Sequence, residues 1–174
     1  MISLNAKGNE CIIGTKGNST ILKSSLIREN LRSGRIDLVN SYLGSIYKIN
    51  GHVVRGYSRG TKIGFPTANL KYDSKNLIIP KNGVYYTNTI YKDKKYNSLS
   101  NIGFRPTFSS RNSVKTIETY IITEDSLDLY GEYITIEFLE FIRDEKKFKS
   151  YNDLVVQIKK DINKVNNRSM NVCS

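Results

Sequence analysis

The spacing of apolar residues predicts two short helices near the start of the 174-residue chain. Between residues 24 and 43 apolar side chains recur three and four positions apart. Ser24 or Ser25 can cap the first helix, and Asp37 can cap the second, which Gly44 ends. Two helices of this length bury too little surface to be stable alone, so we expect them to pack against a larger unit.

From residue 45 the apolar period changes to two, which is the period of a half-buried strand. Strands are expected at residues 46–49, 52–55, 83–91, 96–102, 116–122 and 133–142. Asp93-Lys94-Lys95 is the expected tip of a hairpin. Short strands at regular intervals favour an antiparallel barrel or sandwich over a doubly wound parallel sheet.

The two ends of the chain differ from this middle part. Residues 1–20 are polar and rich in Gly and Asn, and predict a loose strand or a frayed arm. Near the other end, Ser150 and Asp153 form a capping-box pattern. The apolar stripe of the helix that follows is formed by Leu154, Val155, Ile158, Ile162 and Val165. The pattern as a whole predicts a mainly β protein, a small barrel closed by a C-terminal helix.

Composition narrows the class of protein. A formal charge of +11, from 27 Lys and Arg against 16 Asp and Glu, suits nucleic acid, an anionic surface or a polyphosphate substrate, but the charge is dispersed. No apolar run is long enough to span a membrane, and the first residues do not resemble a secretion signal. Cys11 and Cys173 lie near opposite ends and cannot build a disulfide framework or a zinc site. We therefore expect a cytoplasmic protein.

A glycine-rich stretch between residues 55 and 69 is the richest candidate for chemistry. Gly56, Gly60 and Gly64 are four residues apart and would let the backbone approach an anion closely. Arg59 and Lys62 add positive charge that suits phosphates. A glycine-rich hairpin with a polar turn would have the same pattern, and neither a Walker A loop nor a G-x-G-x-x-G motif is present.

Three polar residues at the end of this stretch and beyond it could hold a metal or accept a proton. Thr67 and Asn69 come after Pro66 at a spacing of two, so both side chains face one way on an extended segment and offer oxygens suited to Mg²⁺. Glu118, on an expected strand, could accept a hydroxyl proton if the glycine stretch lies nearby. Alone it would be an ordinary surface carboxylate. The single histidine, His52, lies on an expected strand, and we expect it to have a structural role and not a catalytic one.

Together these segments resemble the riboflavin kinase family, which occurs alone in eukaryotes and as the C-terminal half of bacterial bifunctional FAD synthetases. The resemblance runs from about residue 44 to 162. It is carried by GHVVRG at 51–56, RG at 59–60, GFPTAN at 64–69, GVY at 83–85, NIGFRPTF at 101–108, ET at 118–119, DLYG at 128–131 and RDEKKF at 143–148.

The resemblance implies a six-stranded antiparallel barrel that transfers the γ-phosphate of ATP to the ribityl 5′-hydroxyl of riboflavin, giving FMN, with Mg²⁺ as cofactor. It makes Glu118 the catalytic base and Thr67 and Asn69 the metal ligands. The ATP-binding residues would be Gly56, Lys62, Thr67, Asn69, Ile121, Thr123 and Tyr130. The flavin-binding residues would be Arg143, Lys146 and Phe148.

Residues 21–43 resemble the last piece of the adenylyltransferase half of bacterial FAD synthetases, with Lys23 where a serine is expected. That half needs a His-x-x-His-type signature, so this chain alone is not expected to make FAD unless a separate adenylyltransferase partner completes the site. The expected division has three parts. Residues 1–43 form an N-terminal arm, which is a remnant of the adenylyltransferase half. Residues 44–165 form the kinase barrel with its helix, and residues 166–174 form a tail.

Two other functions fit parts of the sequence. A flavin- or nucleotide-binding module without catalysis would keep the barrel, but Thr67, Asn69 and Glu118 are all present. A basic barrel that binds single-stranded nucleic acid would need its charge and tyrosines gathered on one face. The dispersed charge argues against nucleic acid as a partner, and nothing in the sequence predicts a membrane partner.

Overall fold

The computed structural model describes residues 3–4, 10–15, 18–56, 59–72, 77–105 and 114–172. Side chains are described from residue 24 on, apart from those of Arg59, Lys62, Arg105, Val114 and residues 169–172.

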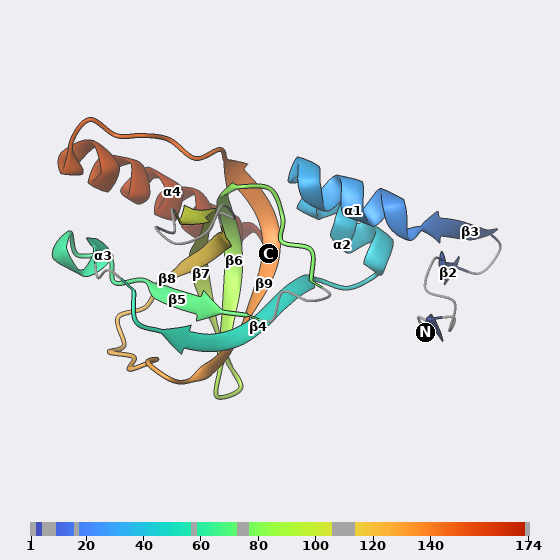
Figure 1. Cartoon of the computed structure of the whole chain (residues 1–174), viewed down its shortest axis with the longest axis horizontal. Coiled ribbons are helices and arrows are strands. Elements are labelled where there is room, and N and C mark those ends of the chain that lie inside the picture. Colours follow the sequence, from blue (N-terminus) through green and yellow to red (C-terminus); the bar gives the residue numbers. More distant parts are fainter. Residues whose placement is uncertain are drawn as a thin grey trace.

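Six antiparallel strands close into a barrel, which confirms the predicted fold class (Figure 1). The strands are β4 (Tyr47–Val54), β5 (Ala68–Lys71), β6 (Gly83–Tyr91), β7 (Lys94–Arg105), β8 (Val114–Ile121) and β9 (Tyr133–Arg143). Their order around the barrel is β4-β5-β8-β7-β6-β9. Inward-facing side chains such as Ile49, Tyr85, Ile102, Ile136 and Phe138 fill the interior, because alternate residues of a strand point to the same side.

Five of the six predicted strands differ from the structure in at least one end. The strands expected at 46–49 and 52–55 form one strand, β4, which continues through Gly51. A Cβ at Gly51 would overlap the Lys71 carbonyl, so glycine here allows β5 to approach rather than making a turn. The hairpin turn lies at Lys92 and Asp93, whose φ angles are 47° and 61°, and β7 begins at Lys94.

The two N-terminal helices, α1 (Ser24–Ser33) and α2 (Ile36–Leu43), pack on the barrel as expected. Leu31, Ile36 and Val39 are buried in the same core as the strands. Asp37 is not the N-cap of α2, because Arg35 holds that position without a side-chain cap and Asp37 lies in the first turn. The C-cap is Gly44, with a left-handed φ of 62°, as predicted.

The first residues form more structure than the expected loose strand or frayed arm. β1 (Ser3–Leu4), β2 (Glu10–Thr15) and β3 (Asn18–Lys23) pair as a three-stranded antiparallel sheet. β3 runs directly into α1, and Figure 1 shows this sheet on the far side of α1 and α2 from the barrel.

The C-terminal helix, α4 (Tyr151–Val172), lies across the barrel. The Ser150 hydroxyl accepts a hydrogen bond from the Asp153 backbone N–H at 3.1 Å, which confirms the predicted cap. Val165 packs against Val84 and Leu99 on the outer faces of β6 and β7. The helix continues to residue 172, so residues 166–172 are helical where a tail was expected. Among the described residues, no helix is long and apolar enough to cross a membrane.

Candidate active site

Two cavities meet at Thr67 and Tyr120, which line both. The larger one, about 780 Å³, lies between the outer face of the barrel and α4, and we call it the helix cavity. It is lined by Gly60, Ile63, Phe65, Thr67, Val84, Leu99, Ser100, Asn101, Glu118, Tyr120, Arg143, Glu145, Lys146, Phe148, Tyr151, Leu154, Ile158 and Asp161. The smaller one, about 440 Å³, includes Arg55, Gly56, Thr123 and Tyr130, and we call it the loop cavity.

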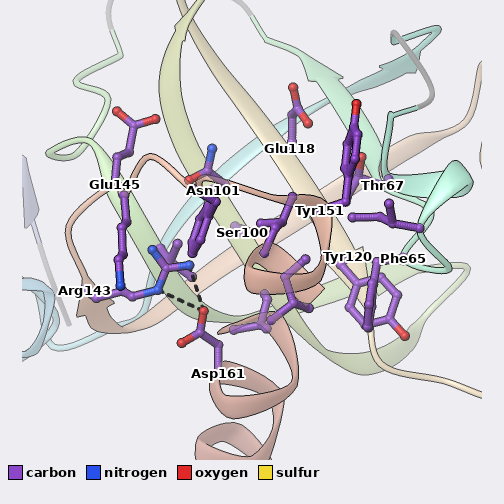
Figure 2. Close-up of a pocket in the computed structure, with 18 residues that line it drawn as sticks. Phe65, Thr67, Ser100, Asn101, Glu118, Tyr120, Arg143, Glu145, Tyr151 and Asp161 are labelled. Atoms are coloured by element: carbon purple, nitrogen blue, oxygen red, sulfur yellow. Dashed lines mark hydrogen bonds and ion pairs between the residues drawn. The ribbon is translucent and has the colours of Figure 1, made fainter. Parts of the chain in front are cut away.

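Glu118 lies at the centre of a polar row that crosses three strands. On β8 its neighbours Ile117 and Thr119 are buried in the barrel, so Glu118 is on the outer face and lines the helix cavity (Figure 2). Asn69 of β5 is its register partner on one side, and Asn101 of β7 is its partner on the other. Directly opposed residues of an antiparallel pair have Cβ atoms about 4.5–5.5 Å apart. The barrel therefore brings the predicted base next to a predicted metal ligand.

The glycines of the loop let the backbone lie close to the predicted metal ligands. A Cβ at Gly56 would overlap the side-chain amide of Asn69. A Cβ at Gly60 would overlap the Phe65 carbonyl and come within 3.4 Å of the Thr67 hydroxyl oxygen. The backbone there is held by α3 (Arg59–Lys62) and by the Phe65 N–H, which donates to the Gly60 carbonyl at 2.8 Å. Any side chain at position 56 would displace Asn69.

Most residues predicted to bind ATP gather at the loop cavity. Gly56, Ile121, Thr123 and Tyr130 all line it, although Thr123 lies just beyond the end of β8. The Thr123 hydroxyl accepts a hydrogen bond from the Asp125 N–H at 3.1 Å. Of Lys62, the structure describes the backbone in α3, and its side chain lies outside the described part.

Arg55 also lines the loop cavity, although the sequence did not single it out. Its guanidinium carbon lies 4.9 Å from the centre of the Tyr130 ring, which places a cation at the edge of this cavity. A basic residue directly before the glycine stretch was a signal that could have indicated Arg55.

The residues predicted to bind flavin, Arg143, Lys146 and Phe148, line the helix cavity. Arg143 forms an ion pair with Asp161 of α4, with Nη2 2.8 Å and Nε 2.9 Å from Oδ2 (Figure 2). Gln157 donates to the other carboxylate oxygen at 2.9 Å. Asp161 is only 1% exposed, so this pair fixes the Arg143 guanidinium on the cavity wall.

Sequence reasoning missed Asp161, although a signal was present. Asp161 lies between Ile158 and Ile162 on the apolar stripe of α4, where an acidic residue is unusual unless it has a partner. The partner lies on β9, 18 residues earlier, and only the packing of α4 on the barrel reveals it.

Polar contacts hold the segment after β9 against the turn before β6. Lys81 Nζ lies 2.6 Å from an Asp144 carboxylate oxygen. The Asn82 side-chain amide donates to Glu145 at 3.1 Å. The segment after β9 therefore lies along the helix cavity, with Glu145 among its lining residues.

Aromatic rings form much of the rest of the helix cavity. Phe65 and Tyr120 meet edge to face with ring centres 5.3 Å apart. Phe148 and Tyr151 line the cavity as well. Such rings suit a flat aromatic ligand, while Glu118, Thr67 and Asn69 supply oxygens for proton transfer or for a hard cation.

Comparisons with known proteins agree with these features. The model of the riboflavin kinase (flavokinase) family matches residues 43–169. The chain is 37% identical over 140 residues to a bifunctional riboflavin kinase/FMN adenylyltransferase from Bacillus subtilis, covering 80% of this chain and 44% of that protein. It is 38% identical over 146 residues to the protein of that description from Buchnera aphidicola, covering 83% of this chain and 46% of the relative.

A solved structure titled as a macrolide-efflux protein from Streptococcus pneumoniae shares the fold, with a TM-score of 0.78 and 30% identity over 90% of this chain and 49% of that one. The chain spans less than half the length of the curated relatives that it matches. Because the family model covers most of its residues, the barrel included, the chain belongs to the riboflavin kinase family.

Proposed function

We propose that the chain transfers the γ-phosphate of ATP to the ribityl 5′-hydroxyl of riboflavin, giving FMN and ADP. The observation that carries this proposal is the position of Glu118. It is the register partner of Asn69 and lines the same cavity as Thr67, which itself lines both cavities. These positions support a reaction in which a nucleotide from one side and an alcohol from the other would meet beside the proposed base and the two proposed oxygen ligands.

The loop cavity is the proposed ATP site. Its glycine-rich rim brings the backbone close to Asn69, which suits backbone contacts with phosphates, and Arg55 supplies a positive charge. Ile121, Thr123 and Tyr130 would line the rest of the nucleotide site, with Lys62 near the phosphates. The helix cavity is the proposed riboflavin site. Its volume of about 780 Å³ is within the usual range for ligand pockets, and its aromatic lining suits the isoalloxazine ring.

In this proposal Glu118 is the general base. A primary alcohol is too weak an acid to lose its proton beforehand, so the carboxylate takes the proton as the new P–O bond forms and the bond to ADP breaks. Such assistance contributes about 10²–10⁴-fold to the rate. The larger share of the acceleration comes from in-line positioning of the two substrates and from charge stabilisation at the phosphates.

Thr67 and Asn69 are the proposed Mg²⁺ ligands. A hydroxyl and an amide oxygen are the hard donors that Mg²⁺ accepts, and the glycines at 56 and 60 let the backbone lie close to both side chains. The described residues contain no cluster of three His, Cys, Asp or Glu, so phosphate oxygens would complete the ligand set. When bound, Mg²⁺ would neutralise part of the phosphate charge.

FAD formation is not part of the proposal for this chain. The family match begins at residue 43, and the single histidine, His52, lies in β4. Residues 1–43 are proposed to correspond to the end of the adenylyltransferase half, and a separate partner would be needed for that reaction. We expect riboflavin phosphorylation to take place in the cytoplasm.

The test is a product analysis. The purified chain is incubated with riboflavin, ATP and Mg²⁺, and FMN is separated from FAD by chromatography. We expect FMN without FAD, and no FMN when ATP or Mg²⁺ is left out. Absence of FMN under varied divalent metals would overturn the proposal and favour a binding module. Formation of FAD would overturn the interpretation of residues 1–43.

A further inference from the structure

A third hollow, of about 350 Å³, lies between the segment that follows β9 and the first turns of α4. We call it the lysine hollow. It is lined by Lys146, Lys147, Phe148, Lys149, Asp153, Val156, Gln157 and Lys160. Four of these eight residues are lysine, whereas lysine makes up 18 of the 174 residues of the chain. The concentration of cations is therefore local and not a result of composition alone.

The lysine hollow carries a net positive charge. Its four lysines and one aspartate give a formal charge of +3. In the part of the chain that the structure describes, no carboxylate forms an ion pair with any of these four lysines. Lys146 instead lies over the Phe148 ring, at 5.8 Å from its centre. Several ammonium groups around one hollow favour a ligand with more than one negative charge.

The lysine hollow also offers apolar surface. Phe148 lines it, and Val156 is 52% exposed there. An inorganic anion would leave these side chains in water, whereas an aromatic phosphate would contact both the ring and the cations. The chemistry therefore fits an organic phosphate with a flat ring.

The helix cavity has the opposite charge balance. Glu118, Glu145 and Asp161 outnumber Arg143 and Lys146, which gives a formal charge of −1. Riboflavin is uncharged, whereas its phosphorylated form carries a charge of about −1.5 to −2, as a phosphate monoester does near neutral pH. The two flavins thus differ in charge, and so do the two sites. Lys146 and Phe148 line both sites, so the helix cavity and the lysine hollow share a wall.

We propose that the lysine hollow binds FMN, with the phosphate among the lysines and the ring system against Phe148 and Val156. That FMN is the product of this chain rests on the proposed function. The site then holds the product beside the cavity where it is made, and leaves the helix cavity free for the next riboflavin. The reaction class that would consume this product is transfer of a second group to the flavin phosphate.

The test variant replaces Lys147, Lys149 and Lys160 with Gln, because none of these three lines either substrate cavity. The matched control replaces Lys48, Lys94 and Lys164 with Gln, which are exposed lysines on β4, β7 and α4 outside the hollow. Both variants lose the same charge. A general effect of net charge would therefore appear in both.

Binding is measured by equilibrium dialysis at low ionic strength, with each flavin quantified by chromatography. Saturating riboflavin fills the helix cavity, and FMN is then titrated. We expect FMN to bind wild type under these conditions, and the hollow variant to bind it about tenfold more weakly, since three of the four cations around the phosphate are lost. Riboflavin binding should be unchanged in both variants, and FMN binding should be unchanged in the control.

Three results would overturn the proposal. They are complete displacement of FMN by riboflavin, wild-type FMN affinity in the hollow variant, and an equal loss in the control. ADP is titrated in parallel. If the binding of ADP depends on the three lysines and the binding of FMN does not, the hollow is a nucleotide site and the proposal is overturned. The dialysis needs no turnover, so a failed product analysis would remove the role of FMN as product without affecting the binding result.

Discussion

Asn69 and Glu118 face each other directly across the β5–β8 pair. In the barrel β5 lies between β4 and β8, so the end of the glycine loop and the middle of a later strand are neighbours. Val54 is the register partner of Asn69 on the other side, and Asn101 is the partner of Glu118. The proposed base and a proposed metal ligand are thus fixed by backbone pairing, not by a mobile loop.

Removing the proposed metal ligands should abolish nucleotide binding that depends on Mg²⁺. In the double variant Thr67→Ala and Asn69→Ala, both side-chain oxygens are lost while the backbone pairing of β5 stays. Calorimetry with ATP in the presence and absence of Mg²⁺ measures the effect. An Mg²⁺-dependent affinity equal to that of wild type would contradict the ligand assignment.

A side chain at position 56 should interfere with ATP through Asn69. In Gly56→Ala the new methyl group overlaps the Asn69 amide, so we expect the KM for ATP to rise by at least about tenfold, or about 1.4 kcal/mol of binding. Gly131→Ala is the control. Its Cβ would meet no atom within 4 Å, and its φ of 81° would lower stability by about 1 kcal/mol without moving Asn69. Steady-state kinetics with both variants compares the two effects, and an unchanged KM in Gly56→Ala would refute the contact.

The ion pair between Arg143 and Asp161 should contribute to stability as well as to the shape of the helix cavity. Asp161→Asn leaves the guanidinium, whose side chain is 20% exposed, without its charged partner. For a fully buried pair the free energy of unfolding would fall by about 3–5 kcal/mol. Because Arg143 is partly exposed, we expect a loss of about 2 kcal/mol. Urea unfolding measures it, with the exposed Asp125→Asn as control. Equal midpoints for wild type and Asp161→Asn would show that the pair is not stabilising.

The helices before the barrel should be part of its folding unit. Ile36 of α2 is fully buried in the barrel core, so Ile36→Ala should lower the free energy of unfolding by about 2–4 kcal/mol in one cooperative transition. Leu26→Ala, at a position 37% exposed on α1, should have a much smaller effect. Two separate transitions, or no loss from Ile36→Ala, would mean that residues 24–43 fold independently of the barrel.

Much of the fold could be predicted because its strands alternate clearly. Residues 83–91 form β6 with the predicted ends, since a run rich in aromatic and β-branched residues lies between two turns. β5 was not predicted as a strand, because four residues are too few to show a period. The end of α4 was placed too early, because its last turns are polar and follow the final apolar position, Val165.

The site could be predicted residue by residue but not as an arrangement. The motif around Thr67 and the carboxylate at Glu118 were visible in the sequence, whereas their neighbourhood depends on strand order and register. Arg143 was found by resemblance, while its partner Asp161 required the packing of a helix on a barrel. The lysine hollow was hidden for the same reason, since Lys160 and Lys147 come from different elements.

The most direct test of the account is the rate of FMN formation by Glu118→Gln. The amide keeps the shape of the side chain but cannot take the hydroxyl proton, so we predict turnover at least about tenfold below wild type, with ATP and riboflavin binding retained. Glu124→Gln, at an exposed position after β8, should turn over like wild type. FMN formation by Glu118→Gln at the wild-type rate would contradict the proposed role of Glu118.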